Sequence, residues 1–228
     1  MTNQQPTPLP SPNCDSRDGH AIDMLVLHYT GMKDGARAMD RLTDPTAEVS
    51  AHYVVDEQGQ AFALVSEDMR AWHAGKAYWR GHTNINQRSI GIEIVNPGHE
   101  FGYRPFPEKQ MLAVIALCKD ILSRHDIPAH NVVGHSDVAP TRKQDPGELF
   151  DWARLAEAGV GHWGLGIRGK DNPQSPMPNP QCLVDYGYEA ADKPTITAFQ
   201  RHFRPSNISG QWDEECGRIL QNLLDSDH

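Results

Sequence analysis

Three short apolar runs constrain the fold of this chain more than any other feature of its sequence. They cover residues 22–27 (IDMLVL), 89–95 (SIGIEIV) and 131–134 (NVVG), and their lengths are typical of strands. Between the last two, residues 107–125 repeat apolar side chains at helical spacing, with a proline at the start, where its missing N–H does no harm. Strands that alternate with helices predict an α/β domain with a mixed central β-sheet flanked by helices, over residues 21–163.

Shorter signals predict the remaining elements of this domain. A helix is expected over residues 35–42, where apolar residues are spaced three apart and an Asp-Pro pair follows. Residues 52–55 and 61–65 flank a turn that contains glycine, which predicts a hairpin. A further helix should begin near Glu148.

The segments outside this domain differ from it in composition. Residues 1–20 are polar and Pro-rich and are expected to be an unstructured lead-in, and residues 164–181 are expected to be a Pro-rich linker. Residues 182–228 predict a small C-terminal all-α helical module, which should lean on the main domain because so small a core is marginal alone. Its helical pieces are expected at 183–186, 195–203 and 212–224, with a core that contains Phe199, Phe203 and Leu220.

Charge and cysteine content exclude several classes of protein. The chain has 21 basic and 30 acidic residues and a net charge of −9, which argues against a nucleic-acid-binding or anionic-membrane face. Its longest strictly apolar run, Met111 to Cys118, is far shorter than the roughly 20 residues of a membrane span. The four cysteines lie far apart without a CxxC pair, so we expect free thiols.

Two of the twelve histidines stand at the ends of apolar strands. His28 follows the first run, His135 follows the third, and Asp145 comes ten residues later. Two imidazoles and one carboxylate form a ligand set that leaves tetrahedral zinc one open position for water. The spacing by itself is a weak signal, because no HxxxH or HExxH pair is present, and capped strand ends or core histidines are the alternative.

A carboxylate inside the second run adds to this pattern. Glu93 alternates with three isoleucines and should lie on the opposite face of the strand. Burying a carboxylate is costly, so an ionisable group at this position is a functional candidate. A structural salt bridge to an arginine and a solvated sheet face are the alternatives. Lys143, two residues before Asp145, would bring a positive charge to the same crevice.

Together these segments resemble a known family. The motifs are LHYT (27–30), SAHYVVDEQG (50–59), AWHAGKAYWRG (71–81), SIGIEIVN (89–96), VVGHSDVAPTRKQDPG (132–147) and AFQRHFRP (198–205). They resemble the type 2 N-acetylmuramoyl-L-alanine amidases, zinc enzymes related to phage T7 lysozyme and the peptidoglycan recognition proteins. The resemblance covers residues 28–163, and the C-terminal unit is similar to the peptidoglycan-binding module of two-domain members of the broad-specificity branch.

The resemblance implies a function and a set of site residues. The expected reaction is hydrolysis of the amide between N-acetylmuramic or anhydromuramic acid and L-alanine of the stem peptide. His28, His135 and Asp145 would bind Zn²⁺, with Glu93 and Lys143 as catalytic residues. The expected partners are peptidoglycan or muropeptides. His52 and His73 lie in similar motifs but are not ligands in the family.

Muropeptides carry carboxylates, so an acidic protein needs local positive charge and flat apolar faces to hold them. The candidate substrate contacts are Trp72, His73, Trp79, Arg80 and Arg88.

Two rival functions and two locations stay open. One rival is a non-catalytic peptidoglycan-binding protein on the same fold, and the other is an unrelated zinc hydrolase. The N-terminal sequence shows no basic segment followed by an apolar one, so a cytoplasmic location is expected, with a periplasmic or outer-membrane-associated one if a leader has been removed. Intact sacculus and recycled fragments are both open as substrates.

Overall fold

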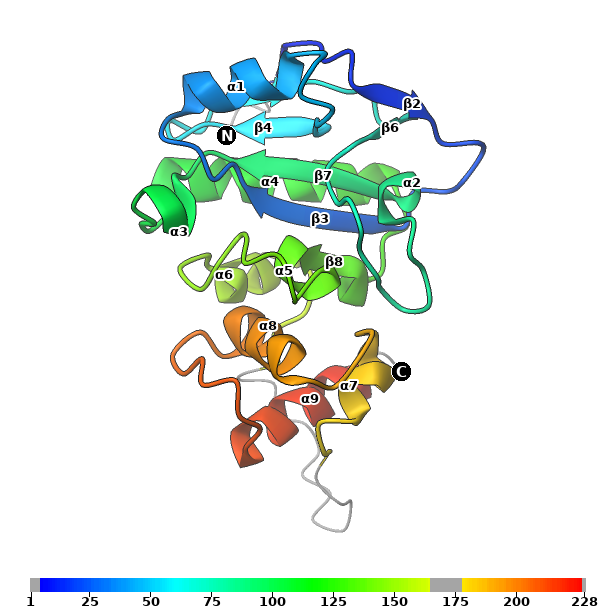
Figure 1. Ribbon diagram of the computed structural model, residues 1–228, viewed down its shortest axis with the longest axis vertical. Helices are drawn as coiled ribbons and strands as arrows, with labels where there is room; N and C mark the ends of the chain where they lie inside the picture. The colour runs from blue at the N-terminus through cyan, green and yellow to red at the C-terminus, as the bar shows by residue number, and fades with distance from the viewer. Residues whose placement is uncertain (1–4, 165–177, 227–228) are drawn as a thin grey trace.

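Six strands form the central sheet of the computed structural model, which describes residues 5–164 and 178–226. Their order is β1 (Thr7–Pro8), β5 (Ala61–Ala63), β4 (Tyr53–Val55), β7 (Ser89–Ile94), β3 (Met24–Tyr29) and β8 (Val132–Gly134). β4, β7, β3 and β8 run parallel to one another, whereas β4 and β5 pair antiparallel as the expected hairpin (Figure 1). The expectation of a mixed sheet flanked by helices is confirmed.

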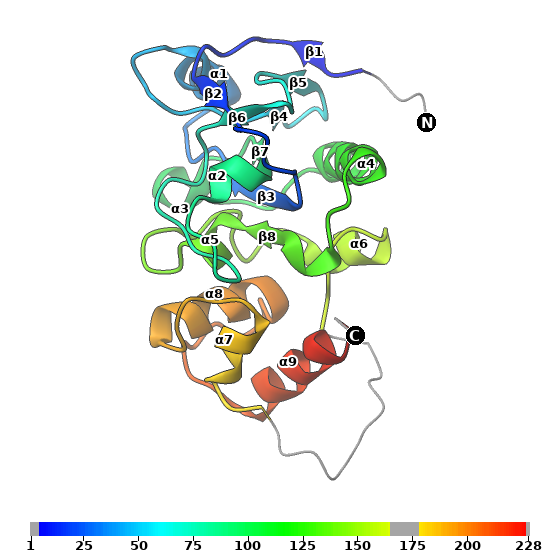
Figure 2. The same ribbon diagram turned by 90° about the vertical axis from the view of Figure 1, so that its right-hand side faces the viewer.

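Alternation along β3 and β7 sorts their side chains onto the two faces of the sheet. Leu25 and Leu27 of β3 join the isoleucines of β7 in a core that α4 (Glu108–Arg124) covers. Figure 2 shows α4 on one side of the sheet and α2 (Ile85–Arg88) and α3 (Gly98–Phe101) on the other. His28 lies directly opposite Glu93 in the parallel register, on the face away from α4. The pleat therefore brings an imidazole and a carboxylate together near the carboxyl ends of two strands.

The remaining helices of this region frame the same end of the sheet. α1 spans Gly35–Thr43, and its N-cap Asp34 accepts a hydrogen bond from the backbone N–H of Arg37. The short 3₁₀ helix η1 (Ala129–Asn131) leads directly into β8, and α5 (His135–Val138) follows β8 without a loop. The helix expected near Glu148 is α6 (Trp152–Glu157), which begins later because Asp151 caps its N-terminus.

Residues 5–20 pack against the domain, contrary to the unstructured lead-in expected over 1–20, and residues 1–4 lie outside the described part of the chain. β1 extends the edge of the central sheet, and β2 (Cys14–Ser16) pairs antiparallel with β6 (Met69–Ala71). Arg17 is buried, and its guanidinium donates hydrogen bonds to the backbone carbonyls of Glu67, Gln87 and Ser89. Backbone pairing, the buried Arg17 and the side chains of Ser11 and Asn13 hold the segment, and average composition does not reveal such contacts.

The C-terminal helices share a core with the sheet. α7 (Cys182–Tyr186), α8 (Lys193–Phe203) and α9 (Glu214–Ser226) lie below β8 in both views (Figures 1 and 2). Phe199, Phe203 and Leu220 are buried, and they belong to one apolar cluster with Met24 and Val26 of β3. This cluster provides the support that so small a helical unit needs. Most of the expected linker, 165–177, lies outside the described residues, and the domain boundaries stay predictions.

A buried aspartate joins these helices to the end of β8. The carboxylate of Asp137 in α5 accepts hydrogen bonds from the Tyr188 hydroxyl at 2.9 Å and from the backbone N–H of Gly134 at 2.7 Å. His202 Nδ1 of α8 lies 2.8 Å from the same carboxylate, and the ring of His202 stacks on Trp152 at 3.7 Å between centroids. The C-terminal helices are thus anchored two residues from His135.

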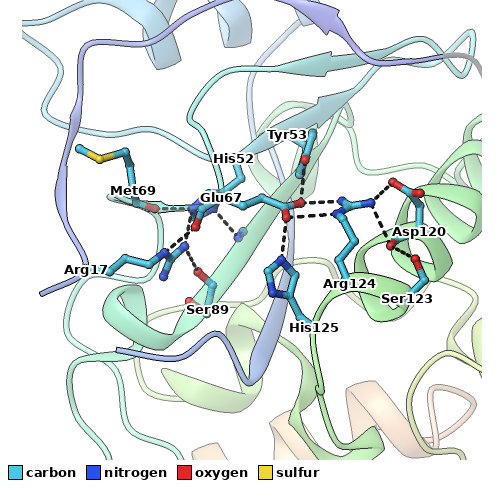
Figure 3. A network of polar contacts seen from close by, with 11 residues as sticks. Arg17, His52, Tyr53, Glu67, Met69, Ser89, Asp120, Ser123, Arg124 and His125 are labelled. Atoms are coloured by element: carbon cyan, nitrogen blue, oxygen red, sulfur yellow. Dashed lines mark hydrogen bonds and ion pairs between the residues drawn. The ribbon is translucent and has the colours of Figure 1, made fainter. Parts of the chain in front are cut away.

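A second polar network ties the segment after β5 to the end of α4 (Figure 3). The Glu67 carboxylate accepts hydrogen bonds from the Tyr53 hydroxyl and from Arg124, both at 2.7 Å, and lies 2.6 Å from His125 Nε2. Burial alone would raise the pKa of Glu67, but the hydrogen bonds from Arg124, His125 and Tyr53 lower it from 4.5 to about 2. The ionised carboxylate therefore stabilises the folded state.

Replacing Glu67 with glutamine tests this contribution. We expect a loss of about 1–2 kcal/mol at neutral pH, between the values of exposed and buried ion pairs. A lowered pKa contributes stability that is fully present above the unfolded-state value and lost as the pH falls, so the difference from the unmodified protein should shrink between about pH 4.5 and pH 2. Urea unfolding of both proteins across this pH range measures the difference in their free energies of unfolding. Glu57→Gln, which removes an exposed pair with Arg104, is the matched control and should cost under about 0.5 kcal/mol. An equal, pH-independent loss in both variants would contradict the assignment.

Candidate active site

A pocket of about 280 Å³ opens at the carboxyl ends of β3 and β7. The residues predicted from sequence that line it are Trp72, His73, Glu93, His135, Lys143 and Asp145. His28 lies behind this surface, 1% exposed. Carboxyl ends of parallel strands are where α/β sheets place their ligands, because the chain diverges there and leaves a crevice.

Three buried side chains converge at the base of this pocket. His28 Nδ1 and His135 Nδ1 are 2.9 Å apart, and each lies 3.0 Å from Asp145 Oδ2. They come from β3, from the start of α5 and from the loop after it, so residues far apart in sequence meet through sheet pairing. Among the described residues, they are also a group of potential metal ligands whose donor atoms all lie within 4.8 Å of one another.

The electrostatics of this cluster suit a cation. Burial, and then the nearby His135, lower the pKa of His28 to about 4, so its imidazole is neutral at physiological pH. Burial would raise the pKa of Asp145, but the adjacent imidazoles, His135 first and then His28, hold it well below its usual range. Two imidazoles and one carboxylate are donors that zinc accepts. The residues present therefore fit that metal.

His135 has a defined orientation. Its Nε2 lies 3.0 Å from the carbonyl oxygen of Ala74, which can only accept a hydrogen bond. This contact is shorter than the 3.4 Å between the same Nε2 and Arg142 Nη2, so it places the proton on Nε2, and the bare Nδ1 faces Asp145 and His28. The backbone N–H of Ser136 donates to the Asp145 carbonyl at 2.9 Å, which holds the loop against the start of α5.

Glu93 is half-buried, and its environment differs from that of Asp145. No hydrogen-bond partner within residues 5–164 and 178–226 reaches Oε2, which is shielded from solvent. Burial, and then the negative charge of Asp145, raise the pKa of Glu93 well above its usual value, whereas Lys143 opposes the shift. No arginine in the described part of the chain forms a salt bridge with Glu93, and the side chain lines the pocket instead of an open sheet face. A carboxyl group in this state can take up and release a proton.

Three of the expected substrate contacts lie outside the pocket. Trp79 is 1% exposed and packs edge-on against Tyr186 and Tyr188, so it offers no free ring face to a sugar. Arg88 precedes β7, at the opposite end from Glu93, and pairs with Asp23. Arg80 donates to the Tyr186 carbonyl at 2.6 Å. Of the five contacts expected, Trp72 and His73 line the pocket.

Sequence reasoning missed other residues that line the pocket. Tyr29, Met32 and Arg41 are among them, and Arg41 with Lys143 supplies basic side chains there. Tyr29 directly follows His28 in the LHYT motif, which was a usable signal. Arg41 carried none, because only the packing of α1 over the end of the sheet brings it to the pocket.

A buried site of two histidines and one aspartate, next to a carboxyl group with a raised pKa, is the arrangement of metal-dependent hydrolases. The chain belongs to the N-acetylmuramoyl-L-alanine amidase family, whose model matches residues 18–148. Within the described residues, no helix is both long and apolar enough to cross a membrane.

Similar proteins extend this match beyond the family model. The amidase AmiD of Escherichia coli is 38% identical over 231 residues, which cover 90% of this chain and 83% of AmiD. The 1,6-anhydro-N-acetylmuramyl-L-alanine amidase AmpD of the same species is 33% identical over 165 residues, which cover 64% of this chain and 88% of AmpD.

Two solved structures cover nearly the whole chain. AmiD from E. coli in complex with the substrate anhydro-N-acetylmuramic acid-L-Ala-D-gamma-Glu-L-Lys matches with a TM-score of 0.81 at 36% identity, over 93% of this chain and 90% of that one. AmpDH3 from Pseudomonas aeruginosa, in complex with anhydromuramic pentapeptide, matches with a TM-score of 0.80 at 33% identity, over 100% and 98%.

Proposed function

We propose that this amidase is a zinc enzyme that hydrolyses the amide between N-acetylmuramic or anhydromuramic acid and L-alanine of peptidoglycan stem peptides. The observation that carries the proposal is the convergence of His28, His135 and Asp145 at one pocket that Glu93 also lines, with Glu93 Oε2 lacking a hydrogen-bond partner among the described residues. These three residues would hold the metal. Zinc in such a site supplies a nucleophilic water at neutral pH and polarises the scissile carbonyl.

The side chains around the ligands divide the remaining work. The Glu93 carboxylate accepts a proton from the attacking water and passes it to the departing alanine nitrogen, a role that suits a carboxyl group with a raised pKa. Lys143 stabilises the negative charge that develops on the carbonyl oxygen, a contribution worth roughly 3 kcal/mol per donor. A pure binding protein has no need of a carboxyl group with a raised pKa beside the three candidate ligands, which favours catalysis over the receptor alternative.

The pocket is also suited to a muropeptide. Lys143 and Arg41 bring positive charge to the pocket of a chain whose net charge is −9, and Trp72 adds an aromatic side chain. AmiD and AmpDH3, with which this chain shares its fold, were solved with anhydromuramyl peptides. We therefore include anhydro-muropeptides among the substrates. In the cytoplasm the enzyme would act on recycled cell-wall fragments. In the periplasm or at the outer membrane it would act on the peptidoglycan of the wall itself.

A cleavage assay tests the proposed function. Purified protein is incubated with anhydro-muropeptide, with and without a chelator, and the products are separated by mass. We expect release of a peptide that begins with L-alanine, its loss on chelation and its return when zinc is added back. Binding without release would support a peptidoglycan receptor. Cleavage of peptides that lack muramic acid would support an unrelated zinc hydrolase.

A further inference from the structure

We propose that His73 and Ser89 form a hydrogen-bond relay that holds His28 in its metal-binding tautomer, which makes them positioning residues for the ligand. The inference rests on the proposed function insofar as His28 is taken to be a metal ligand. Neither residue is one of the three ligands, and Ser89 does not line the pocket.

Four groups form a continuous chain behind the pocket. His28 Nε2 lies 3.1 Å from His73 Nδ1, and His73 Nε2 lies 3.1 Å from Ser89 Oγ. The Ser89 hydroxyl ends the chain by donating to the Ile85 carbonyl oxygen at 2.7 Å. His28, Ile85 and Ser89 are at most 1% exposed, and His73 is 9% exposed, so water has little access to any of these contacts.

With both imidazoles neutral, only one placement of the protons makes all three contacts hydrogen bonds. The Ile85 carbonyl can only accept, so it takes the one hydroxyl proton of Ser89. Ser89 Oγ must then accept from His73 Nε2–H, which leaves His73 Nδ1 bare in a neutral imidazole. That bare nitrogen accepts from His28 Nε2–H. His28 Nδ1 is consequently unprotonated, and it is the atom that faces His135 and Asp145.

The backbone around His73 is shaped to hold its ring. A Cβ atom on Gly91 of β7 would lie 2.5 Å from Cγ of His73, so only glycine lets the ring lie against the strand. The rings of His73 and His28 meet edge to face, with centroids 5.1 Å apart and an interplanar angle of 81°. This packing fixes where His73 Nδ1 stands relative to His28.

One short segment orients both histidine ligands. His73 acts on His28 through its ring, and the next residue, Ala74, acts on His135 through its carbonyl oxygen. Asn86 Oδ1 accepts hydrogen bonds from the backbone N–H groups of His73 and Ala74, at 3.2 Å and 2.8 Å, and so holds the segment in place. The control of His135 depends on backbone and resists substitution, whereas the control of His28 depends on side chains and is open to test.

Ser89→Ala is the sharpest variant, because it removes the anchor of the relay without touching the pocket. We expect zinc affinity to fall roughly 10- to 100-fold, measured by competition with a chromophoric chelator. His73→Phe, which keeps a ring and removes both nitrogens, should weaken affinity at least as much. The double variant should be no weaker than His73→Phe alone, because both residues act through His28. Ser11→Ala, which removes a buried hydroxyl that donates to the Leu42 carbonyl, is the matched control and should leave zinc affinity unchanged.

A second measurement separates the relay from the proposed function. In the metal-free protein, long-range ¹H–¹⁵N NMR spectra of the His28 ring should show the proton on Nε2, and Ser89→Ala should mix the two tautomers. This reading does not depend on catalysis or on zinc. Zinc affinity within twofold of the unmodified protein in both single variants, or an unchanged tautomer in Ser89→Ala, would overturn the proposal. Failure of the unmodified protein to bind zinc or cleave muropeptide would refute the proposed function instead.

Discussion

Glu93→Gln is expected to remove nearly all turnover while leaving zinc bound at one equivalent. The amide keeps the shape of the side chain but cannot accept the proton of the attacking water, so kcat should fall by roughly 10² to 10⁴. The three ligand side chains are untouched, and the removed charge lies in a site where burial already opposes ionisation. Product release from anhydro-muropeptide and metal content by mass spectrometry, on the same preparation, measure both effects.

The control for this variant is the same chemical change elsewhere. Glu67→Gln replaces a carboxylate that is bound to Arg124 and Tyr53, outside the pocket lining, and should lower stability but not turnover. If Glu93→Gln retained a near-normal rate with zinc bound, Glu93 would not be the proton carrier.

His28→Ala is expected to lose both the metal and the activity. The substitution leaves two protein ligands. Catalytic zinc is normally held by three, so the metal should bind much more weakly. It also leaves Asp145 buried with one imidazole partner in place of two. We expect less than about a tenth of an equivalent of zinc after dialysis and no detectable cleavage.

An exposed histidine provides the comparison. His82 lies on the surface and outside the pocket, so His82→Ala should retain one equivalent of zinc and normal turnover. Stoichiometric zinc in His28→Ala would show that the metal is held elsewhere, and the ligand assignment would then fail.

Periodicity was sufficient to predict the centre of the fold. The runs at 22–27 and 89–95 correspond to β3 and β7, and the helix expected over 107–125 is α4, Glu108–Arg124. Alternation along a strand indicates which side chains face the core, so it also predicted that Glu93 lies on the face opposite the isoleucines. The same reasoning failed for residues 5–20, because β1 and β2 are held by backbone pairing, which polar and Pro-rich composition does not reveal.

Strand ends suggested that His28, His135 and the loop with Asp145 would meet, since parallel strands bring their carboxyl ends to one edge of the sheet. The family resemblance supplied their expected roles and those of Glu93 and Lys143. Tertiary packing decided the rest. It buried Trp79, turned Arg88 away from the pocket, brought Arg41 to the pocket through α1, and aligned His73 with Ser89 behind His28. These outcomes depend on contacts between segments far apart in the chain, and a close-packed interior allows each side chain only the position that its neighbours leave.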